Sequence, residues 1–171
     1  NYYTVVDRTL NEWSEWQLRN LNAIVWLYRG ETENYKRLIQ DYWRYFSQIA
    51  EEYDNAAWHM ENPTFDKVLQ VAKVTEASFA NSLKQYQEAM KATKKRKEKA
   101  ELKANVAELE AQVTELREAV TVAEEAVWLT SKFGYDGVYQ DIPGLCRIAT
   151  IAQIAEKDYS LTPGAYVGVA E

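Results

Sequence analysis

The clearest pattern in this chain is the recurrence of apolar side chains at three- and four-residue steps, which is typical of amphipathic helices. Thr9-Leu10-Asn11-Glu12 fits a capping box that starts a first helix, and Gly30 supplies a residue able to end it in the left-handed conformation. Thr32 restarts the pattern. We therefore expect two antiparallel helices joined near Gly30. The apolar face expected in the first comprises Trp13, Trp16, Leu21, Ile24, Val25 and Tyr28. The face expected in the second comprises Tyr35, Leu38, Tyr42, Phe46, Ile49 and Tyr53.

Residues 65–129 contain neither glycine nor proline and carry two further apolar stripes. The first stripe occupies residues 65–90 with one interruption of phase. The second alternates steps of four and three over nearly four heptads, which is the spacing of a coiled-coil seam. Its residues are Leu102, Val106, Leu109, Val113, Leu116, Val120, Ala123 and Val127. This pattern predicts a long helix that is paired along its length.

A basic run at residues 91–99 separates the two stripes, and the apolar phase breaks there. Either the chain reverses into an antiparallel hairpin with arms of ~45 Å, or one helix continues for ~100 Å. Two apolar faces that need covering favour the hairpin, whereas the lack of Gly, Pro or Asn in the run counts against it. We expect the hairpin. The six cations of the run, which are candidates for contact with the DNA backbone or else a solvated surface, are Lys91, Lys94, Lys95, Arg96, Lys97 and Lys99.

From Lys132 onward, glycine and proline mark loops and turns. Thr150-Ile151-Ala152-Gln153 is a second capping-box pattern, which predicts a short helix to about Lys157. We expect this tail to pack back on the other elements, because several of its apolar residues need burial. They are Leu145, Ile148, Ile151, Ile154 and Leu161.

Together these patterns predict an all-α fold in three parts. Residues 1–62 hold 13 of the 22 aromatic residues and form an aromatic-rich helical core. Residues 63–131 form a long antiparallel coiled-coil helical hairpin, and residues 132–171 form a Gly/Pro-rich tail with one short helix.

The composition narrows the classes of function. The chain has 171 residues and a net charge of −6, and the basic run itself carries +5. Without an apolar run of about 18 residues or a signal peptide, we expect a cytoplasmic protein with no membrane partner. The single cysteine, Cys146, excludes a disulfide framework and a Cys-rich zinc site. The single histidine, His59, argues against a His-based catalytic or metal site. No nucleophile, base and oxyanion site assemble from the pattern, so we assign no catalytic, cofactor-binding or metal-binding residue.

Asn62-Pro63-Thr64-Phe65 is similar to the Asn-Pro-Pro-aromatic turn of amino-methylating DNA methyltransferases. The second proline is absent, and neither a β-branched strand nor a Gly-rich nucleotide loop precedes the string. Every residue is accounted for by the start of a helix, with Pro63 in its first turn. We interpret the string as a helix start.

Two pairs of strings carry a resemblance to a known family. Val6-Asp7-Arg8-Thr9-Leu10 and the segment 21–30 stand near the beginning. Tyr139-Gln140-Asp141-Ile142-Pro143-Gly144-Leu145-Cys146 and the segment 159–169 stand near the end. In this order they resemble the C-terminal part of the modification (methyltransferase) subunit of type I restriction-modification systems. The motif residues are Asp141, Pro143, Gly144, Thr162, Pro163, Gly164, Tyr166 and Gly168. Ala165 stands where the family usually has Arg, which puts any polar contact of that Arg in doubt.

The resemblance implies a parent enzyme that transfers a methyl group from S-adenosylmethionine to the N6 of adenine in DNA. Its partners are a specificity subunit, a restriction subunit and, through the complex, DNA. The cofactor-binding and catalytic motifs of the family lie upstream of the region that resembles this chain, so no catalytic residue carries over and no cofactor is expected in this segment. We expect a structural and subunit-docking segment. The alternative is a stand-alone helical scaffold that is unrelated to DNA modification.

Overall fold

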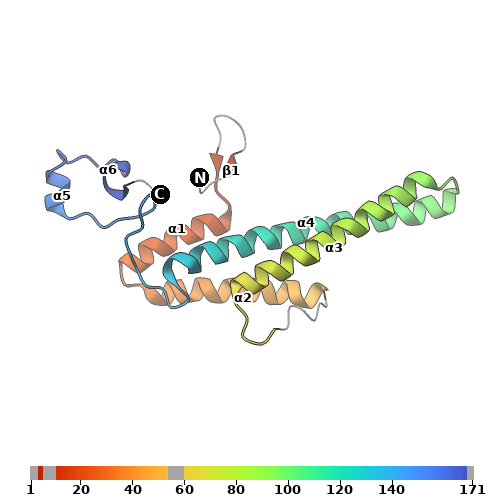
Figure 1. Ribbon diagram of the computed structural model, residues 1–171, viewed down its shortest axis with the longest axis horizontal. Helices are drawn as coiled ribbons and strands as arrows, with labels where there is room; N and C mark the ends of the chain where they lie inside the picture. Colours follow the sequence, from red (N-terminus) through yellow and green to blue (C-terminus); the bar gives the residue numbers. More distant parts are fainter. Residues whose placement is uncertain (1–3, 6–10, 54–59, 169–171) are drawn as a thin grey trace. The chain divides into compact units, whose positions relative to one another are not determined.

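The structure is a computed structural model that describes residues 4–5, 11–53 and 60–168, and these residues are predominantly α-helical (Figure 1). This confirms the all-α class. A minor addition is the antiparallel pair of two-residue strands β1 (Thr4–Val5) and β2 (Asn11–Glu12). The helices are α1 (Glu15–Tyr28), α2 (Thr32–Tyr53), α3 (Phe65–Ala92), α4 (Arg96–Phe133), α5 (Ile151–Ala155) and α6 (Gly164–Val167).

The chain divides into two compact units. The first comprises Asn1–Ile39 and Leu129–Glu171, and the second comprises Gln40–Trp128. Helices α2 and α4 therefore each contribute residues to both units. Among the described residues, no helix combines the length and the apolar character needed to cross a membrane.

Helix α1 begins five residues later than the predicted capping box would place it, because the N-cap is Ser14 and not Thr9. Ser14 is the N-cap: the Gln17 backbone N–H donates to Ser14 Oγ (3.2 Å), and the Ser14 N–H donates to Gln17 Oε1 (2.9 Å). The prediction of a capping box at residues 9–12 is wrong, because Asn11 and Glu12 belong to β2. Residues 6–10, which include part of that string and the first family string, lie outside the described residues.

The buried face of α1 also differs from the prediction. Its buried residues are Asn20, Ala23 and Leu27, whereas Val25 and Tyr28 are 44% and 58% exposed. Trp13, outside the helix, is exposed as well. Helix α1 is apolar on nearly all sides after Asn20, so the spacing alone does not select a face, and the small Ala23 side chain permits a close approach to neighbours.

Helix α2 follows its predicted pattern closely. Gly30 has φ +75°, as expected for the residue that ends α1, and α2 starts at Thr32. Of its predicted stripe, all residues except the part-buried Tyr53 are buried.

In the second unit, Phe65 at the start of α3 is fully buried among α2 rings, stacking on Trp43 with ring centroids 4.2 Å apart and meeting Tyr42 edge-on at 5.7 Å. Large aromatic surfaces thus anchor α3 on α2.

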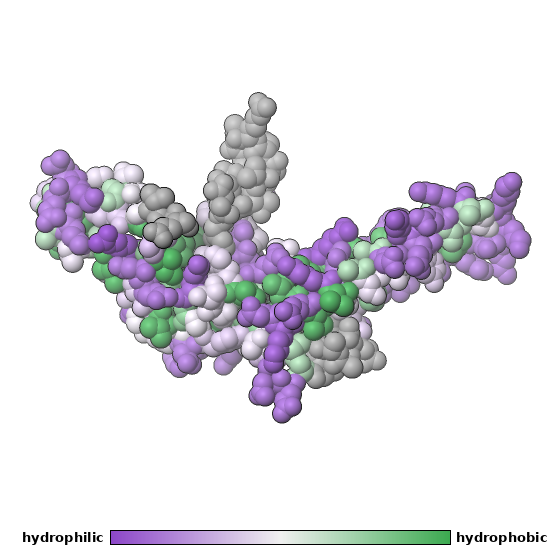
Figure 2. Space-filling model, in the orientation of Figure 1, coloured by the Kyte–Doolittle hydropathy of each residue, from purple (hydrophilic) through white to green (hydrophobic). Residues whose placement is uncertain are grey.

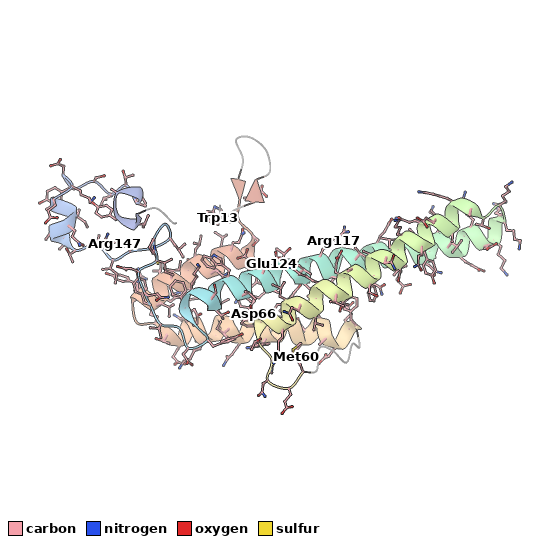
Figure 3. All side chains as sticks on the ribbon, viewed as in Figure 1. Trp13, Met60, Asp66, Arg117, Glu124 and Arg147 are labelled. Atoms are coloured by element: carbon pink, nitrogen blue, oxygen red, sulfur yellow. The ribbon has the colours of Figure 1, made fainter. Side chains whose placement is uncertain are left out.

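Helices α3 and α4 run antiparallel and are separated by three residues (Figure 1). Lys73 Nζ lies 2.9 Å from Glu124 Oε1, and Gln87 Nε2 donates to Glu110 Oε1 at 3.3 Å. In these pairs, the higher residue number on α3 goes with the lower residue number on α4, as expected for two antiparallel helices. Arg117 and Glu124, both labelled in Figure 3, form the α4 side of two ion pairs with α3, with Glu76 and Lys73 as their respective partners. The chain therefore reverses inside the basic run even though no Gly, Pro or Asn is there.

The tail is attached to the helices of the first unit at its beginning. Tyr35, fully buried, donates from its hydroxyl to the Gly134 carbonyl at 2.5 Å. Gly137, at φ +75°, brings its backbone so close that an added Cβ would lie 2.5 Å from Tyr35 Cδ1 and 2.9 Å from Leu27 Cδ2. Gln140 Nε2 donates to the Lys132 carbonyl at the end of α4.

The predicted burial of the later tail residues is wrong at three positions. Ile148 is 42%, Ile151 82% and Leu161 78% exposed. Helices α5 and α6 are only five and four residues long, so neither presents a full apolar face to a neighbour. The second capping box is confirmed, since Gln153 N–H donates to Thr150 Oγ1 and Thr150 N–H donates to Gln153 Oε1.

Candidate functional site

The first tail motif folds into a tight turn in the first unit. Leu145 N–H donates to the Ile142 carbonyl at 3.0 Å, with Pro143 and Gly144 at the two central positions. Gly144 has φ +74°, the left-handed conformation that the third residue of a type II turn requires, and Pro suits the second. Ile142 and Cys146 exchange backbone hydrogen bonds across the turn. The Pro-Gly pair of the motif is therefore explained by backbone geometry.

Asp141 holds this turn from the side. Its Oδ1 accepts from the Tyr139 hydroxyl at 3.2 Å and from the Ile148 backbone N–H at 3.0 Å. Burial, the neighbouring Cys146 and the hydrogen bond to Asp141 raise the pKa of the Tyr139 hydroxyl above its ordinary value. Tyr139 is consequently a protonated donor at neutral pH, and the carboxylate of Asp141 is committed to structure.

The second tail motif forms α6 and the turn before it. The Tyr166 N–H donates to the Pro163 carbonyl at 2.9 Å, and Gly168 follows the helix with φ +70°. The Tyr166 hydroxyl donates to the Ser160 carbonyl, while Lys157 Nζ lies 5.5 Å from the centre of its ring. Thr162 accepts from the Ala165 N–H through its carbonyl at 3.0 Å.

The two motifs meet in space although about twenty residues separate them. The Gly144 N–H donates to the Val167 carbonyl at 2.9 Å, and Arg147 Nη1 donates to the Tyr166 carbonyl at 3.2 Å. The junction lines an open pocket of about 340 Å³ that includes Asp141 and Gly168. The motif residues thus form one hydrogen-bonded substructure, which we call the motif junction (residues 139–149 and 160–168).

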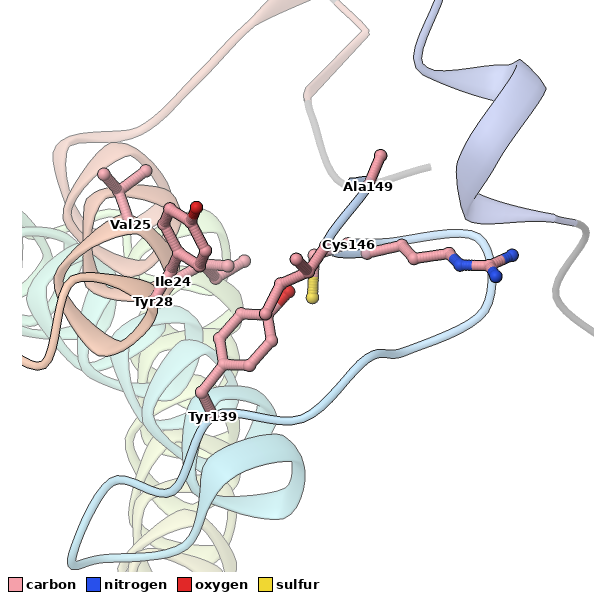
Figure 4. Close-up of a pocket in the computed structure, with 8 residues that line it drawn as sticks. Ile24, Val25, Tyr28, Tyr139, Cys146 and Ala149 are labelled. Atoms are coloured by element: carbon pink, nitrogen blue, oxygen red, sulfur yellow. The ribbon is translucent and has the colours of Figure 1, made fainter. Parts of the chain in front are cut away.

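A groove of about 320 Å³ separates the motif junction from α1 (Figure 4). Ile24, Val25 and Tyr28 form the wall on α1, and the rings of Tyr28 and Tyr139 meet edge-on with centroids 6.1 Å apart. The facing wall consists of Tyr139, Cys146, Arg147, Ile148 and Ala149. The apolar residues of α1 that sequence reasoning placed in a core therefore line an accessible surface.

The groove presents a surface that can bind another molecule, and the side chains that line it do not form a set of catalytic groups. The Cys146 thiol donates to the Gln140 carbonyl at 3.6 Å, and Arg147 is engaged with the Tyr166 carbonyl. Within residues 4–5, 11–53 and 60–168, no group of three or more His, Cys, Asp or Glu side chains is placed to hold a metal ion. His59 lies outside these residues. What the site can do is present mixed apolar and hydrogen-bonding surface to another molecule.

The residues of the predicted coiled-coil seam lie along α4 with graded burial. Val106, Val113, Leu116 and Ala123 are buried, whereas Leu102, Leu109, Val120 and Val127 are half-buried. Beyond Leu116 the buried set also includes Ala119, Val122 and Ala126. The buried face of α4 is therefore wider there than a coiled-coil seam alone requires.

The basic run occupies the turn between α3 and α4, and its six cations are all exposed. Lys91 is in the last turn of α3, Lys94 and Lys95 are in the connection, and Arg96, Lys97 and Lys99 are in the first turn of α4.

The Asn62-Pro63-Thr64-Phe65 string starts α3, as expected. Thr64 is the N-cap and accepts from the Lys67 N–H at 3.4 Å, so Pro63 precedes the helix and is not in its first turn. Asn62 takes φ +53°, which a short polar side chain tolerates.

Sequence reasoning missed the groove and the close approach at Gly137. Only the unusual density of apolar residues in α1, which exceeds what one buried face needs, signalled the groove.

No protein-family model, curated protein sequence or solved structure matches the chain.

Proposed function

We propose that this chain is the C-terminal structural and subunit-docking segment of the modification subunit of a type I restriction-modification system. The parent subunit is an S-adenosylmethionine-dependent DNA adenine-N6 methyltransferase whose catalytic domain lies upstream. One observation supports this more than any other: the two strings that carry the resemblance join through the Gly144 to Val167 and Arg147 to Tyr166 hydrogen bonds. Two strings that form one hydrogen-bonded substructure can present a single surface to a partner, which fits a shared binding role.

The proposal assigns α3 and α4 to an antiparallel coiled-coil hairpin on the aromatic-rich helical core. Its support is the antiparallel order of the bridging pairs and the burial along α4. Val74 and Tyr86 on α3 are 71% and 39% exposed, so the hairpin retains apolar surface for a further helix. Specificity subunits of this family separate their two DNA-reading domains with long paired helices, and the hairpin extends that helical layer.

Methyl transfer is assigned to residues upstream of the chain, and docking to the hairpin and the motif junction. The motif junction offers the apolar side chains and the Arg147 guanidinium that line its groove, and the hairpin offers the exposed Val74 and Tyr86. The specificity subunit is the direct partner, and the restriction subunit and DNA join through the complex.

The test is assembly of the parent enzyme without the hairpin. Residues 65–129 are replaced by a flexible linker in the parent subunit, which is then coexpressed with its cognate specificity subunit. We expect the two subunits to separate on size-exclusion chromatography, while the shortened subunit still binds S-adenosylmethionine and is therefore folded. Intact assembly of the shortened subunit would refute a docking role for the hairpin.

The competing proposal is a stand-alone helical scaffold without any methyltransferase context. The long α3–α4 pair is compatible with it, because paired helices serve many assemblies. Methyltransferase motifs in the same reading frame upstream of Asn1 separate the two proposals. Their absence would favour the scaffold.

A further inference from the structure

The turn between α3 and α4 concentrates positive charge in an otherwise acidic chain. Residues 91–99, here called the basic tip, carry six cations and one carboxylate, whereas the remaining residues sum to −11. All six cationic side chains are exposed. Figure 2 shows the end of the α3–α4 pair covered by strongly hydrophilic residues.

None of these cations is neutralised by the part of the chain that the structure describes. The ion pairs there involve Lys36, Arg44, Lys73 and Arg117, all outside the basic tip. The single acid of the tip, Glu98, accepts a hydrogen bond of 2.9 Å from the Thr93 hydroxyl. The positive charge of the tip is therefore available to an external partner.

Helix electrostatics do not explain this placement. Lys91 near the C-terminus of α3 is favourable, because a cation there offsets the negative end of the helix dipole. Arg96, Lys97 and Lys99 stand in the first turn of α4, where the dipole presents its positive end and favours acidic residues. These cations are unfavourable for the helix that carries them.

The basic tip also stands clear of the third helix of its unit. At the end of α2, the Tyr53 hydroxyl lies 3.3 Å from the Gln112 carbonyl and 2.7 Å from Glu115 Oε2 on α4. From Gln112 to Arg96, α4 extends by about 24 Å at 1.5 Å per residue. The α3–α4 pair thus carries the charge of the basic tip well beyond the end of α2.

We propose that the basic tip binds the phosphodiester backbone of nucleic acid without reading its sequence. Phosphates are recognised by exposed Lys and Arg, and their affinity comes from release of counterions. Residues 91–99 contain no aromatic side chain, so stacking on bases is not available. Ala92 is the only apolar residue among them, so there is no large side chain to insert into a lipid surface. The inference goes beyond subunit docking and does not depend on it.

The test uses the whole 171-residue chain and two fluorescein-labelled DNA duplexes of unrelated sequence. Binding is followed by fluorescence anisotropy at several salt concentrations between about 25 and 200 mM. The tip variant carries K94Q, K95Q, R96Q and K97Q. The matched control carries K36Q, R37Q, R44Q and K67Q, which change four exposed cations elsewhere and give the same net charge. A third variant, K94R with K95R and K97R, retains the charge of the tip.

We expect equal affinity for the two duplexes, within about twofold, and a plot of log K against log salt with a slope of about −0.9 per contacted phosphate. The tip variant loses at least about tenfold in affinity and most of that slope, while the control loses less than about threefold and the arginine variant binds as the wild type does. Circular dichroism checks that every variant is folded.

Three results would overturn the inference. They are no binding to either duplex at the lowest salt concentration, equal loss in the tip and control variants, and binding to vesicles that contain phosphatidylserine when neither duplex is bound. None of these results bears on docking of the specificity subunit, because no second subunit is present in the assay.

Discussion

Gly137 gives the sharpest test of how the tail is attached to the helices of the first unit. Replacing it with alanine adds a Cβ 2.5 Å from Tyr35 Cδ1 and 2.9 Å from Leu27 Cδ2, well inside van der Waals contact. Tyr35 is fully buried and hydrogen-bonded through its hydroxyl, so its ring is not free to move aside. The backbone of residue 137 is also in the left-handed region, at φ +75°.

Two contributions add in the free energy of unfolding. An alanine in the left-handed region costs about 1–2 kcal/mol, and overpacking a buried contact costs about 1–3 kcal/mol. G137A should therefore destabilise the protein by about 2–5 kcal/mol. Gly134 supplies a matched control, because it has φ +69° and no atom within 4 Å of an added Cβ. G134A should cost only the backbone contribution, about 1–2 kcal/mol.

Equilibrium urea unfolding followed by circular dichroism at 222 nm measures both variants, with the slope checked for a single transition. The difference between them isolates the close approach of Gly137 to Tyr35 and Leu27. If G137A is no more destabilising than G134A, within about 0.5 kcal/mol, Gly137 does not lie against Tyr35 and Leu27, and the tail is not attached to α1 and α2 in this way.

Two further predictions concern hydrogen bonding and pH. Y35F removes the hydroxyl that donates to the Gly134 carbonyl and should cost about 1–2 kcal/mol by urea unfolding, whereas unchanged stability would contradict this bond. The negative charge of Glu115, then desolvation and a hydrogen bond between the two side chains, raise the pKa of Glu52 in the folded state. The contribution of Glu52 to stability is therefore greatest below the ordinary pKa of glutamate, and it is lost as the pH rises through the raised pKa. E52Q should therefore raise the melting temperature at pH 7 and flatten its dependence between pH 7 and about 4.5, with E51Q, which removes the same charge at the neighbouring position, as the matched control.

Local sequence signals predicted the elements that depend on neighbouring residues. Gly30 ends α1 because only glycine takes its conformation without strain, and the Thr150–Gln153 capping box starts α5 because its hydrogen bonds span three residues. The buried stripe of α2 follows because its polar face is distinct. Such features need no knowledge of the tertiary contacts.

The features that the sequence did not reveal depend on distant parts of the chain. Pairing with Thr4–Val5 places Asn11 and Glu12 in a strand, which moves the start of α1 to the second Ser/Thr-x-x-Gln/Glu pattern at Ser14. The close approach of Gly137 requires Tyr35, about a hundred residues away in the chain.

The candidate site also has one part that local sequence predicts and another that depends on distant residues. The turn and helix types of the two tail motifs follow from their Pro-Gly pairs, because proline and glycine restrict or extend the backbone locally. The hydrogen bond from the Gly144 N–H to the Val167 carbonyl joins backbone groups that are distant in the chain, and no side-chain pattern in the sequence predicts it. The groove on α1 exists because Val25 and Tyr28 remain exposed after Ala23 and Leu27 are buried.

The proposed docking role is tested by isothermal titration calorimetry of the 171-residue chain with the specificity subunit of the restriction-modification system to which the proposal assigns it. We predict a saturable complex with a dissociation constant below about 1 μM and a negative heat-capacity change from buried apolar surface. The chain lacking residues 65–129 should bind at least about tenfold more weakly. Absence of any heat of binding by the folded chain at tens of micromolar would contradict the proposed docking role.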